Sequence, residues 1–175
     1  MARNVILIGF MGTGKTSTGK CLASRLGFAF LDLDKYIEER EGSTIPVIFA
    51  ERGEAYFRAA EKEAVAAAAA RKNTVIATGG GTVKEPENME RLRQSGPVVC
   101  LTADIDTIVA RTSRRGERPL LDQSDDRRQA VAELLESRRS LYEQAYCSID
   151  TSDRSPLEIA EEICRFLKRE GNLHG

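Results

Sequence analysis

The sequence NVILIGFMGTGKT, residues 4–16, joins an apolar run to a glycine-rich loop, and most of the architecture can be inferred outward from it. The apolar part, NVILIGF, is typical of a buried strand. The part GFMGTGKT, Gly9–Thr16, matches the pattern G-x-x-x-x-G-K-[ST] of a phosphate-binding loop. Its glycines allow a tight turn that brings backbone N–H groups to a phosphate, and a helix starting near Lys15 adds the positive end of its dipole. These residues predict a strand, a phosphate loop and a helix in succession.

This loop predicts that the protein binds a nucleoside triphosphate. Lys15 would place its ammonium group between the β- and γ-phosphates, and the hydroxyl of Thr16 could bind Mg²⁺. The loop alone leaves open whether the phosphoryl group goes to water, as in an ATPase, or to a small molecule, as in a kinase. The guanine-recognition sequence N-K-x-D is absent from the chain, which disfavours a GTPase switch.

The rest of the chain alternates between strand-like and helix-like stretches. Apolar runs predict strands at residues 28–33, 74–78, 97–103 and 147–151. Helical patterns predict helices at residues 14–27, 35–71 (interrupted near 42–46), 86–96, 104–114, 125–146 and 155–170. Residues 114–126 carry charges, Gly and Pro without a period, and we expect a mobile surface segment there. The alternating order predicts an α/β domain with a parallel sheet and helices on both faces, in which ligands bind beyond the carboxyl ends of the strands.

The composition disfavours several classes of function. With 41% hydrophobic and 30% charged residues among 175, the chain suits one globular domain. Its net charge of -1 gives no electrostatic attraction for nucleic acid. No apolar run reaches the roughly 20 residues that span a membrane. The four cysteines are scattered, which indicates buried thiols in a reducing cytoplasm. The single histidine, His174, lies one residue from the end, which disfavours histidine-based catalysis or metal binding.

The second predicted strand ends in FLDLD, Phe30–Asp34, where two carboxylates interrupt an apolar run. Because side chains alternate along a strand, Asp32 and Asp34 are expected to face the same way, and to face the phosphate loop if the two strands are neighbours. Asp32 could hold Mg²⁺ through water. Asp34 could accept a hydrogen bond from an alcohol and orient it or take its proton. The alternative for Asp34 is a helix N-cap before KYIEER, which would not account for Asp32.

Three further features suggest that the phosphoryl acceptor is an anion. GEAYFR places Arg58 on a predicted helix, and ATGGGT offers backbone N–H groups at a strand end. ESRRSLY places Arg138 and Arg139 together on the long helix. Guanidinium groups bind a carboxylate in bidentate fashion. The alternative for each arginine is an ordinary place on the surface of a helix.

Together these motifs resemble those of shikimate kinases. The pieces GFMGTGKT, FLDLD, IFAERGEAYFRAAE, ATGGGT, RPLL and RRSLY occur in the order of that family and at similar spacing, from Asn4 to about Leu167. The resemblance implies a three-layer P-loop kinase fold over residues 1–175, like that of the nucleoside monophosphate kinases, with a five-stranded parallel sheet. It implies a substrate-binding region at about residues 34–61 and a mobile lid at about residues 112–124. The implied reaction is the ATP- and Mg²⁺-dependent phosphorylation of the 3-hydroxyl of shikimate, toward chorismate and the aromatic amino acids.

The resemblance also implies roles for individual residues. The catalytic residues would be Lys15, Asp34 and Arg118, the last reaching the phosphates from the lid. The residues that bind ATP would be Gly12, Thr13, Gly14, Lys15, Thr16, Ser17, Arg111, Arg118, Arg154 and Pro156. Those that bind shikimate would be Asp34, Arg58, Gly79, Gly80, Gly81 and Arg138, with Arg139 as the alternative to Arg138. Thr16 would contact Mg²⁺ directly, and Asp32 would do so through water.

Two other activities are compatible with the same fold. One is another small-molecule kinase, such as one resembling gluconate kinase, and the other is a nucleotide-binding module without catalysis. Asp34 and Arg58, with the glycine triplet, favour a compact hydroxylated carboxylate as the acceptor. The presence of Lys15, Asp34 and Arg118 disfavours a module that has lost catalysis. We predict a cytoplasmic monomer whose partners are shikimate and ATP.

Overall fold

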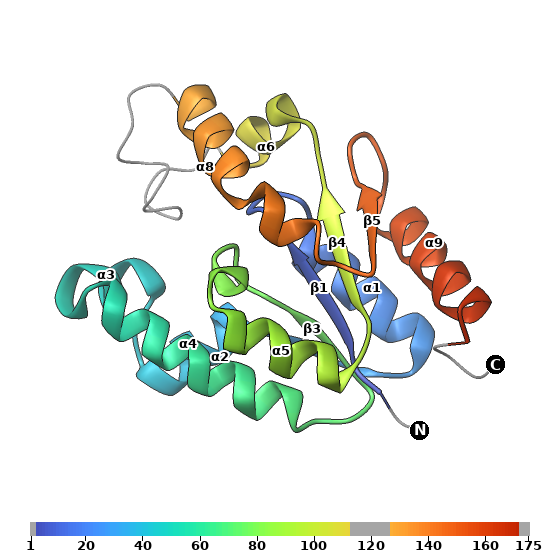
Figure 1. The fold of residues 1–175 in the computed structure, drawn as a ribbon, viewed down its shortest axis with the longest axis horizontal. Coiled ribbons are helices and arrows are strands. Elements are labelled where there is room, and N and C mark those ends of the chain that lie inside the picture. The colour runs from blue at the N-terminus through green and yellow to red at the C-terminus, as the bar shows by residue number, and fades with distance from the viewer. Residues whose placement is uncertain (1–2, 113–126, 172–175) are drawn as a thin grey trace.

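The computed structural model describes residues 3–112 and 127–171, which build one parallel sheet with helices on both of its faces (Figure 1). The sheet has five strands in the order β2-β3-β1-β4-β5, and every pair is parallel. The strands are β1 (Val5–Gly9), β2 (Ala29–Asp32), β3 (Thr74–Ala77), β4 (Val98–Thr102) and β5 (Cys147–Asp150). This arrangement confirms the predicted fold class. The predicted lid falls almost entirely in residues 113–126, outside the described residues.

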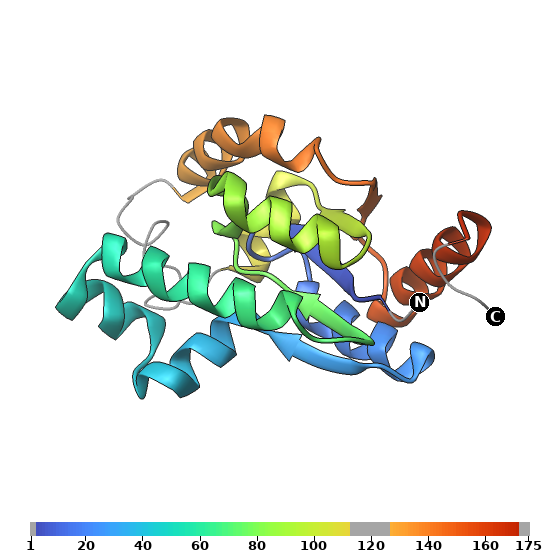
Figure 2. The same ribbon diagram turned by 60° about the horizontal axis from the view of Figure 1, so that its bottom comes forward.

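The sheet is buried on both faces because its apolar side chains alternate between two cores. In β1, Val5 and Leu7 belong to one core, whereas Ile6 and Ile8 belong to the other. The first core is covered by α1 (Lys15–Leu26) and α9 (Pro156–Arg169), and the second by α2 (Leu33–Glu41), α3 (Ile45–Arg52), α4 (Glu54–Ala69), α5 (Pro86–Ser95), α6 (Ile105–Arg111) and α8 (Arg127–Tyr142). Figure 2 shows these two layers on either side of the strands.

The helical region between β2 and β3 is broken twice. The break near residues 42–46 was predicted: Gly42 ends α2 in the left-handed conformation, and Thr44 precedes α3. A second break at Gly53 was not predicted. With φ at 85° and ψ at 168°, Gly53 ends α3 and starts α4 in a new direction, which a residue with a side chain would do only under strain. The two helices form the lobe on the left of Figure 1.

The carboxyl ends of three strands meet at one edge of the sheet. β1 leads into the phosphate loop, β2 ends at Asp32, and β3 leads into the glycine triplet 79–81. The parallel register places Leu7 opposite Ala77 and Ala77 opposite Asp32, so β2 and β3 end at the same level and β1 continues two residues further, to Gly9. β3 lies between β1 and β2, so the assumption that β1 and β2 are neighbours was wrong. The aligned register brings their ends together all the same.

Several helix ends follow the sequence signals. α1 ends at Gly27 in the left-handed conformation. The Ser155 hydroxyl caps α9 by accepting a hydrogen bond from the backbone N–H of Glu158 at 3.2 Å, and Pro156 is the first helical residue. A short 3-10 helix, η1 (Thr82–Lys84), follows the glycine triplet and was not predicted. Residues 125–126, the start of the helix predicted over 125–146, lie outside the described residues, as does His174.

All four cysteines are free thiols within the described part of the chain. Cys100 is buried, and burial raises the pKa of its thiol to about 11. Cys21, Cys147 and Cys164 are half-buried rather than fully buried. No helix within residues 3–112 and 127–171 combines the length and the apolar character that crossing a membrane requires.

Candidate active site

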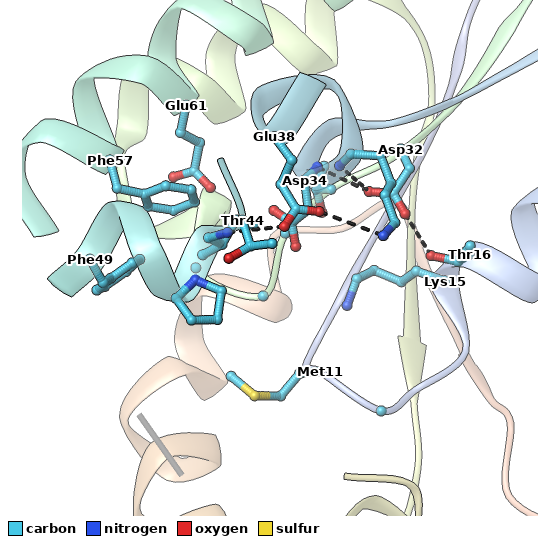
Figure 3. Close-up of a pocket in the computed structure, with 18 of the residues that line it drawn as sticks. Met11, Lys15, Thr16, Asp32, Asp34, Glu38, Thr44, Phe49, Phe57 and Glu61 are labelled. Carbon is cyan, nitrogen blue, oxygen red and sulfur yellow. Dashed lines mark hydrogen bonds and ion pairs between the residues drawn. The ribbon is translucent and has the colours of Figure 1, made fainter. Parts of the chain in front are cut away.

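A cavity of about 890 Å³ opens at the edge of the sheet where β1, β2 and β3 end (Figure 3). The predicted site residues that line it come from distant parts of the chain: Gly12, Gly14, Lys15, Thr16, Ser17, Asp32, Asp34, Arg58, Gly79, Gly80, Gly81, Arg111 and Arg138. Met11, Phe49 and Phe57 add apolar surface to the same cavity. The sequence analysis missed these three because single apolar residues on helices and loops carry no signal of their own.

Asp32 connects the phosphate loop to the start of α2. Its Oδ2 accepts a hydrogen bond from the Thr16 hydroxyl at 2.8 Å, and its Oδ1 accepts from the backbone N–H groups of Asp34 at 3.0 Å and Lys35 at 3.3 Å. Asp32 is therefore the N-cap of α2. This corrects two expectations, because Asp34 does not cap the helix and does not belong to the strand. Asp34 lies in the first turn of α2, and both carboxylates line the cavity.

Lys15 follows Gly14, the left-handed residue that begins α1. Its ammonium group donates to the carbonyl oxygens of Gly9 at 2.7 Å and Phe10 at 3.0 Å, so the charge is held over the phosphate loop. Thr13 is buried instead, and its hydroxyl donates to the Phe10 carbonyl at 2.7 Å. Of the predicted phosphate-loop residues, Thr13 therefore does not line the cavity.

The Arg58 guanidinium is held by acidic residues on its own helix. Nη1 donates to Glu61 Oε1 at 2.9 Å, and Nη2 to Glu54 Oε1 at 3.4 Å. Glu61 is 1% exposed, and its Oε2 accepts a hydrogen bond from the Thr82 hydroxyl at 3.0 Å. Glu61 was not predicted as a site residue. Its i,i+3 spacing from Arg58 can be read from the sequence, but its burial and its hydrogen bond to Thr82 of η1 are visible only in the folded structure.

Arg138 and Arg139 lie in opposite environments, although they are consecutive. Arg138 is 1% exposed and lines the cavity, where Nη1 donates to the Gly80 carbonyl at 3.1 Å. Its guanidinium carbon lies 5.5 Å from the centre of the Phe10 ring. Nε and Nη2 of Arg138 are buried without a hydrogen-bond partner among the described residues. Arg139 is 70% exposed and pairs with Glu136 of α8 and with Glu143, the residue directly after α8.

The glycine triplet lets two charged side chains approach the backbone closely. A Cβ on Gly79 would lie 2.6 Å from Asp34 Oδ1, and a Cβ on Gly81 would lie 2.6 Å from Arg58 Nη2. Contacts that short do not occur in real structures, so any residue other than glycine would displace these groups. The first glycine of the triplet therefore borders the carboxylate of Asp34, and the third borders the guanidinium of Arg58.

The wall around Arg58 and Arg138 is electrostatically positive. The pKa of Lys84 is lowered by partial burial first, and then by the positive charges of Arg138 and Arg58. Tyr142 packs behind the same wall, and its hydroxyl donates to the Gly80 carbonyl at 3.2 Å. Burial raises the pKa of Tyr142 to about 12, so the hydroxyl stays protonated at neutral pH. This wall can bind an anion, and Asp34 borders the first glycine of the triplet.

The residues predicted around the adenine are only partly brought together. Arg111 lines the cavity and donates to the Gly12 carbonyl at 3.1 Å. Arg154 donates to the Asp150 carbonyl at 3.2 Å and pairs with Glu162 of α9; neither it nor Pro156 lines the cavity. Arg118 lies outside the described residues.

Comparison with known proteins identifies the family. A family model described as shikimate kinase matches residues 11–168. The chain belongs to the shikimate kinase family. A shikimate kinase from Thermodesulfovibrio yellowstonii is 45% identical over 97% of this chain and 98% of its own length. The solved shikimate kinase from Acinetobacter baumannii in complex with shikimate superimposes with a TM-score of 0.93 at 38% identity, covering 97% of this chain and 95% of that one.

The alternative of a gluconate-kinase-like enzyme has much weaker support. A solved gluconokinase from Sinorhizobium meliloti has a TM-score of 0.57 and 19% identity, which is a likeness of fold alone. Membership of the shikimate kinase family makes the chain a kinase that uses ATP. The likeness extends over almost the whole chain, so it includes the α3–α4 lobe as well as the common phosphate loop.

Proposed function

We propose that the protein transfers the γ-phosphoryl group of ATP to the 3-hydroxyl of shikimate, giving shikimate 3-phosphate and ADP, a step toward chorismate. The observation that carries this proposal is the state of Arg138. Arg138 lines the cavity, and two of its N–H-bearing nitrogens are buried without a partner among the described residues. Leaving charged donors unsatisfied is costly, whereas a carboxylate would accept from both in the planar geometry that a guanidinium offers.

The arrangement of the other groups fits a small hydroxylated carboxylate. Arg58 and Arg138 both border the glycine triplet, so one carboxylate can lie between the two guanidinium groups. Asp34 borders the first glycine of the same triplet, where it can accept hydrogen bonds from ring hydroxyls. Phe49, Phe57 and Met11 offer apolar surface for the carbon ring. A carboxylate and two guanidinium groups at different positions around the cavity would fix the orientation of the acceptor.

The phosphate loop would place the other substrate against this acceptor. Backbone N–H groups of the loop and the start of α1 can bind the phosphates. The ammonium group of Lys15 would then donate to phosphate oxygens instead of the Gly9 and Phe10 carbonyl oxygens. In the transfer, a bond forms between the acceptor oxygen and the γ-phosphorus while the bond from the γ-phosphorus to the β,γ-bridging oxygen breaks. Asp34 orients the hydroxyl and is placed to take its proton.

The residues near Asp32 fit a magnesium ion bound mainly by phosphates and water. Within the described residues no three acidic, histidine or cysteine side chains cluster as a protein cage for a metal. Mg²⁺ usually keeps several waters and takes few protein ligands. The Thr16 hydroxyl would bind it directly, and Asp32, which now accepts from that hydroxyl, would hold its water. When bound, Mg²⁺ neutralises charge on the β- and γ-phosphates.

One assay tests the proposed function. The purified protein is incubated with Mg²⁺ and ATP, and ADP release is measured with shikimate, with gluconate and without an acceptor. We expect release that depends on shikimate, and a product that carries one phosphate on the 3-hydroxyl by ³¹P NMR. Equal release with gluconate, or release without any acceptor, would contradict the proposal.

We also propose that one chain works alone in the cytoplasm. Support comes from the site itself, since a single chain supplies both the acidic and the basic side of the cavity. The net charge of -1 supports the absence of nucleic acid among its partners. Light scattering at micromolar concentration tests the oligomeric state, and a dimer would contradict the monomer.

A further inference from the structure

Thr151 lies directly after β5, beneath the phosphate loop, and is completely buried. Its hydroxyl lies 2.8 Å from the carbonyl oxygen of Thr13 and 3.0 Å from that of Thr102. Its backbone N–H donates to the same Thr102 carbonyl at 2.8 Å. This one residue therefore joins the end of β5, the end of β4 and the phosphate loop, which are far apart in the sequence.

Thr151 also holds the guanidinium of Arg111. Arg111 Nη1 donates to the Thr151 hydroxyl at 3.2 Å, and Nη2 donates to the Thr151 carbonyl at 3.2 Å. The same Nη1 donates to the Gly12 carbonyl in the phosphate loop at 3.1 Å. Two nitrogens bound to two oxygens of one residue fix both the position and the plane of the guanidinium.

We infer that Thr151 is a positioning residue for the nucleotide: it sets the phosphate loop and Arg111 in place together. The hydroxyl can accept from Arg111 while it donates its own proton to a carbonyl, and valine, which has the same shape, can do neither. Without it the Thr13 carbonyl and Arg111 would each lose a partner, and both belong to segments on the nucleotide side of the cavity. The acceptor side, at Arg58 and Arg138, has no hydrogen bond to Thr151 among those described.

This inference rests on the proposed use of ATP, so the test measures nucleotide binding apart from turnover. The affinity for ADP in the presence of Mg²⁺ is measured by calorimetry on the full chain for wild type, Thr151→Val and Thr151→Ser. Thr74→Val is the matched control. Thr74 is also a buried threonine whose hydroxyl binds one carbonyl, that of Lys72, but at the opposite end of the sheet.

We expect Thr151→Val to weaken ADP binding by roughly tenfold, the size of a lost buried hydrogen bond to a charged group. Thr151→Ser keeps the hydroxyl and should bind within about threefold of wild type. Thr74→Val should bind ADP as wild type does. In steady-state assays the KM for ATP should rise in Thr151→Val while the KM for shikimate stays unchanged. A merely structural role would not raise the KM for ATP while leaving the KM for shikimate unchanged, and it would not restore ADP affinity in Thr151→Ser.

Several results would overturn the inference. Wild-type ADP affinity in Thr151→Val would do so, as would an equal loss in Thr74→Val. If Thr151→Val does not fold, Thr151→Ala removes the same hydroxyl without placing a methyl group against the carbonyls, and it is judged by the same criteria. Failure of both to fold would assign Thr151 to stability alone. Absence of turnover with shikimate in the wild type would refute the proposed acceptor and leave the ADP measurement intact.

Discussion

The hydroxyl of Thr16 donates a hydrogen bond to Asp32 Oδ2 at 2.8 Å. Thr16 follows β1 and Asp32 ends β2, and strand β3 lies between these two strands in the sheet. The contact links the phosphate loop to the helix that carries Asp34, because the other oxygen of Asp32 caps that helix. The capping bonds give Asp32 a role in folding, and we propose a second, separable role toward the metal. Substitutions can distinguish them.

Asp32→Asn keeps a good N-cap, whereas Asp32→Ala removes it. We expect the alanine variant to lose about 1 kcal/mol in its free energy of unfolding and the asparagine variant to lose much less. Both should need more Mg²⁺ for half-maximal activity, since both lose the negative charge. Urea denaturation without nucleotide and a Mg²⁺ titration of activity measure the two effects. An unchanged Mg²⁺ requirement in both would remove Asp32 from the metal site.

Asp34→Asn should abolish turnover without affecting nucleotide binding. The amide cannot take the proton of the acceptor hydroxyl, so kcat should fall by roughly 10²-fold or more. Asp34 borders the glycine triplet on the acceptor side of the cavity, so the Kd for ADP should match that of wild type. Stopped assays and calorimetry provide the two numbers. A variant that keeps more than a tenth of wild-type kcat would exclude Asp34 as proton acceptor.

Arg138→Lys and Arg139→Lys form a matched pair on consecutive positions. Lysine at 138 retains a charge but not the planar fork, so acceptor binding should weaken by about 1.5–3 kcal/mol. Arg139 is 70% exposed, and its ion pairs within the described residues are with Glu136 and Glu143, three and four residues away along the chain, so its substitution should leave the KM for shikimate unchanged. Equal effects of the two changes would mean that the carboxylate does not bind at Arg138.

Gly81→Ala tests the close approach of Arg58. The new methyl group would lie 2.6 Å from Nη2, and the flexible end of the arginine would shift to make room. We expect little change in the free energy of unfolding and a several-fold rise in the KM for shikimate. Gly80→Ala is the control, because its Cβ would meet nothing closer than 3.5 Å. A larger rise for Gly80→Ala than for Gly81→Ala would count against this geometry.

The stability of the fold should fall above pH 9. Burial raises the pKa of the Cys100 and Cys147 thiols to about 11 in the folded protein, above the ordinary value of 9.0 in the unfolded chain. Above pH 9 the unfolded chain therefore releases these protons more readily than the folded protein does, and the balance shifts toward unfolding as pH rises toward 11. Urea unfolding at pH 8, 9 and 10 measures the effect. A double variant with serine at both positions should show a smaller decrease.

Local patterns predicted much of the chemistry but less of its geometry. The spacing of GFMGTGKT identified the phosphate loop, and the alternation of apolar runs predicted the sheet with helices on both faces. The same patterns failed at Asp34, where a strand was continued into what is the first turn of α2. A short apolar run with two aspartates fits either a strand end or a capped helix start, and the capping bonds of Asp32 decide between them.

From the sequence alone one could infer which types of residue form the site and in what order, because motif spacing and periodicity are local properties of the chain. Only the folded structure shows that Arg138 is buried in the cavity while Arg139 lies on the surface, that Glu61 holds Arg58, and that Thr151 lies under the phosphate loop. Those relations depend on which elements pack together, since burial and hydrogen bonding between distant segments are set by the order and register of the strands.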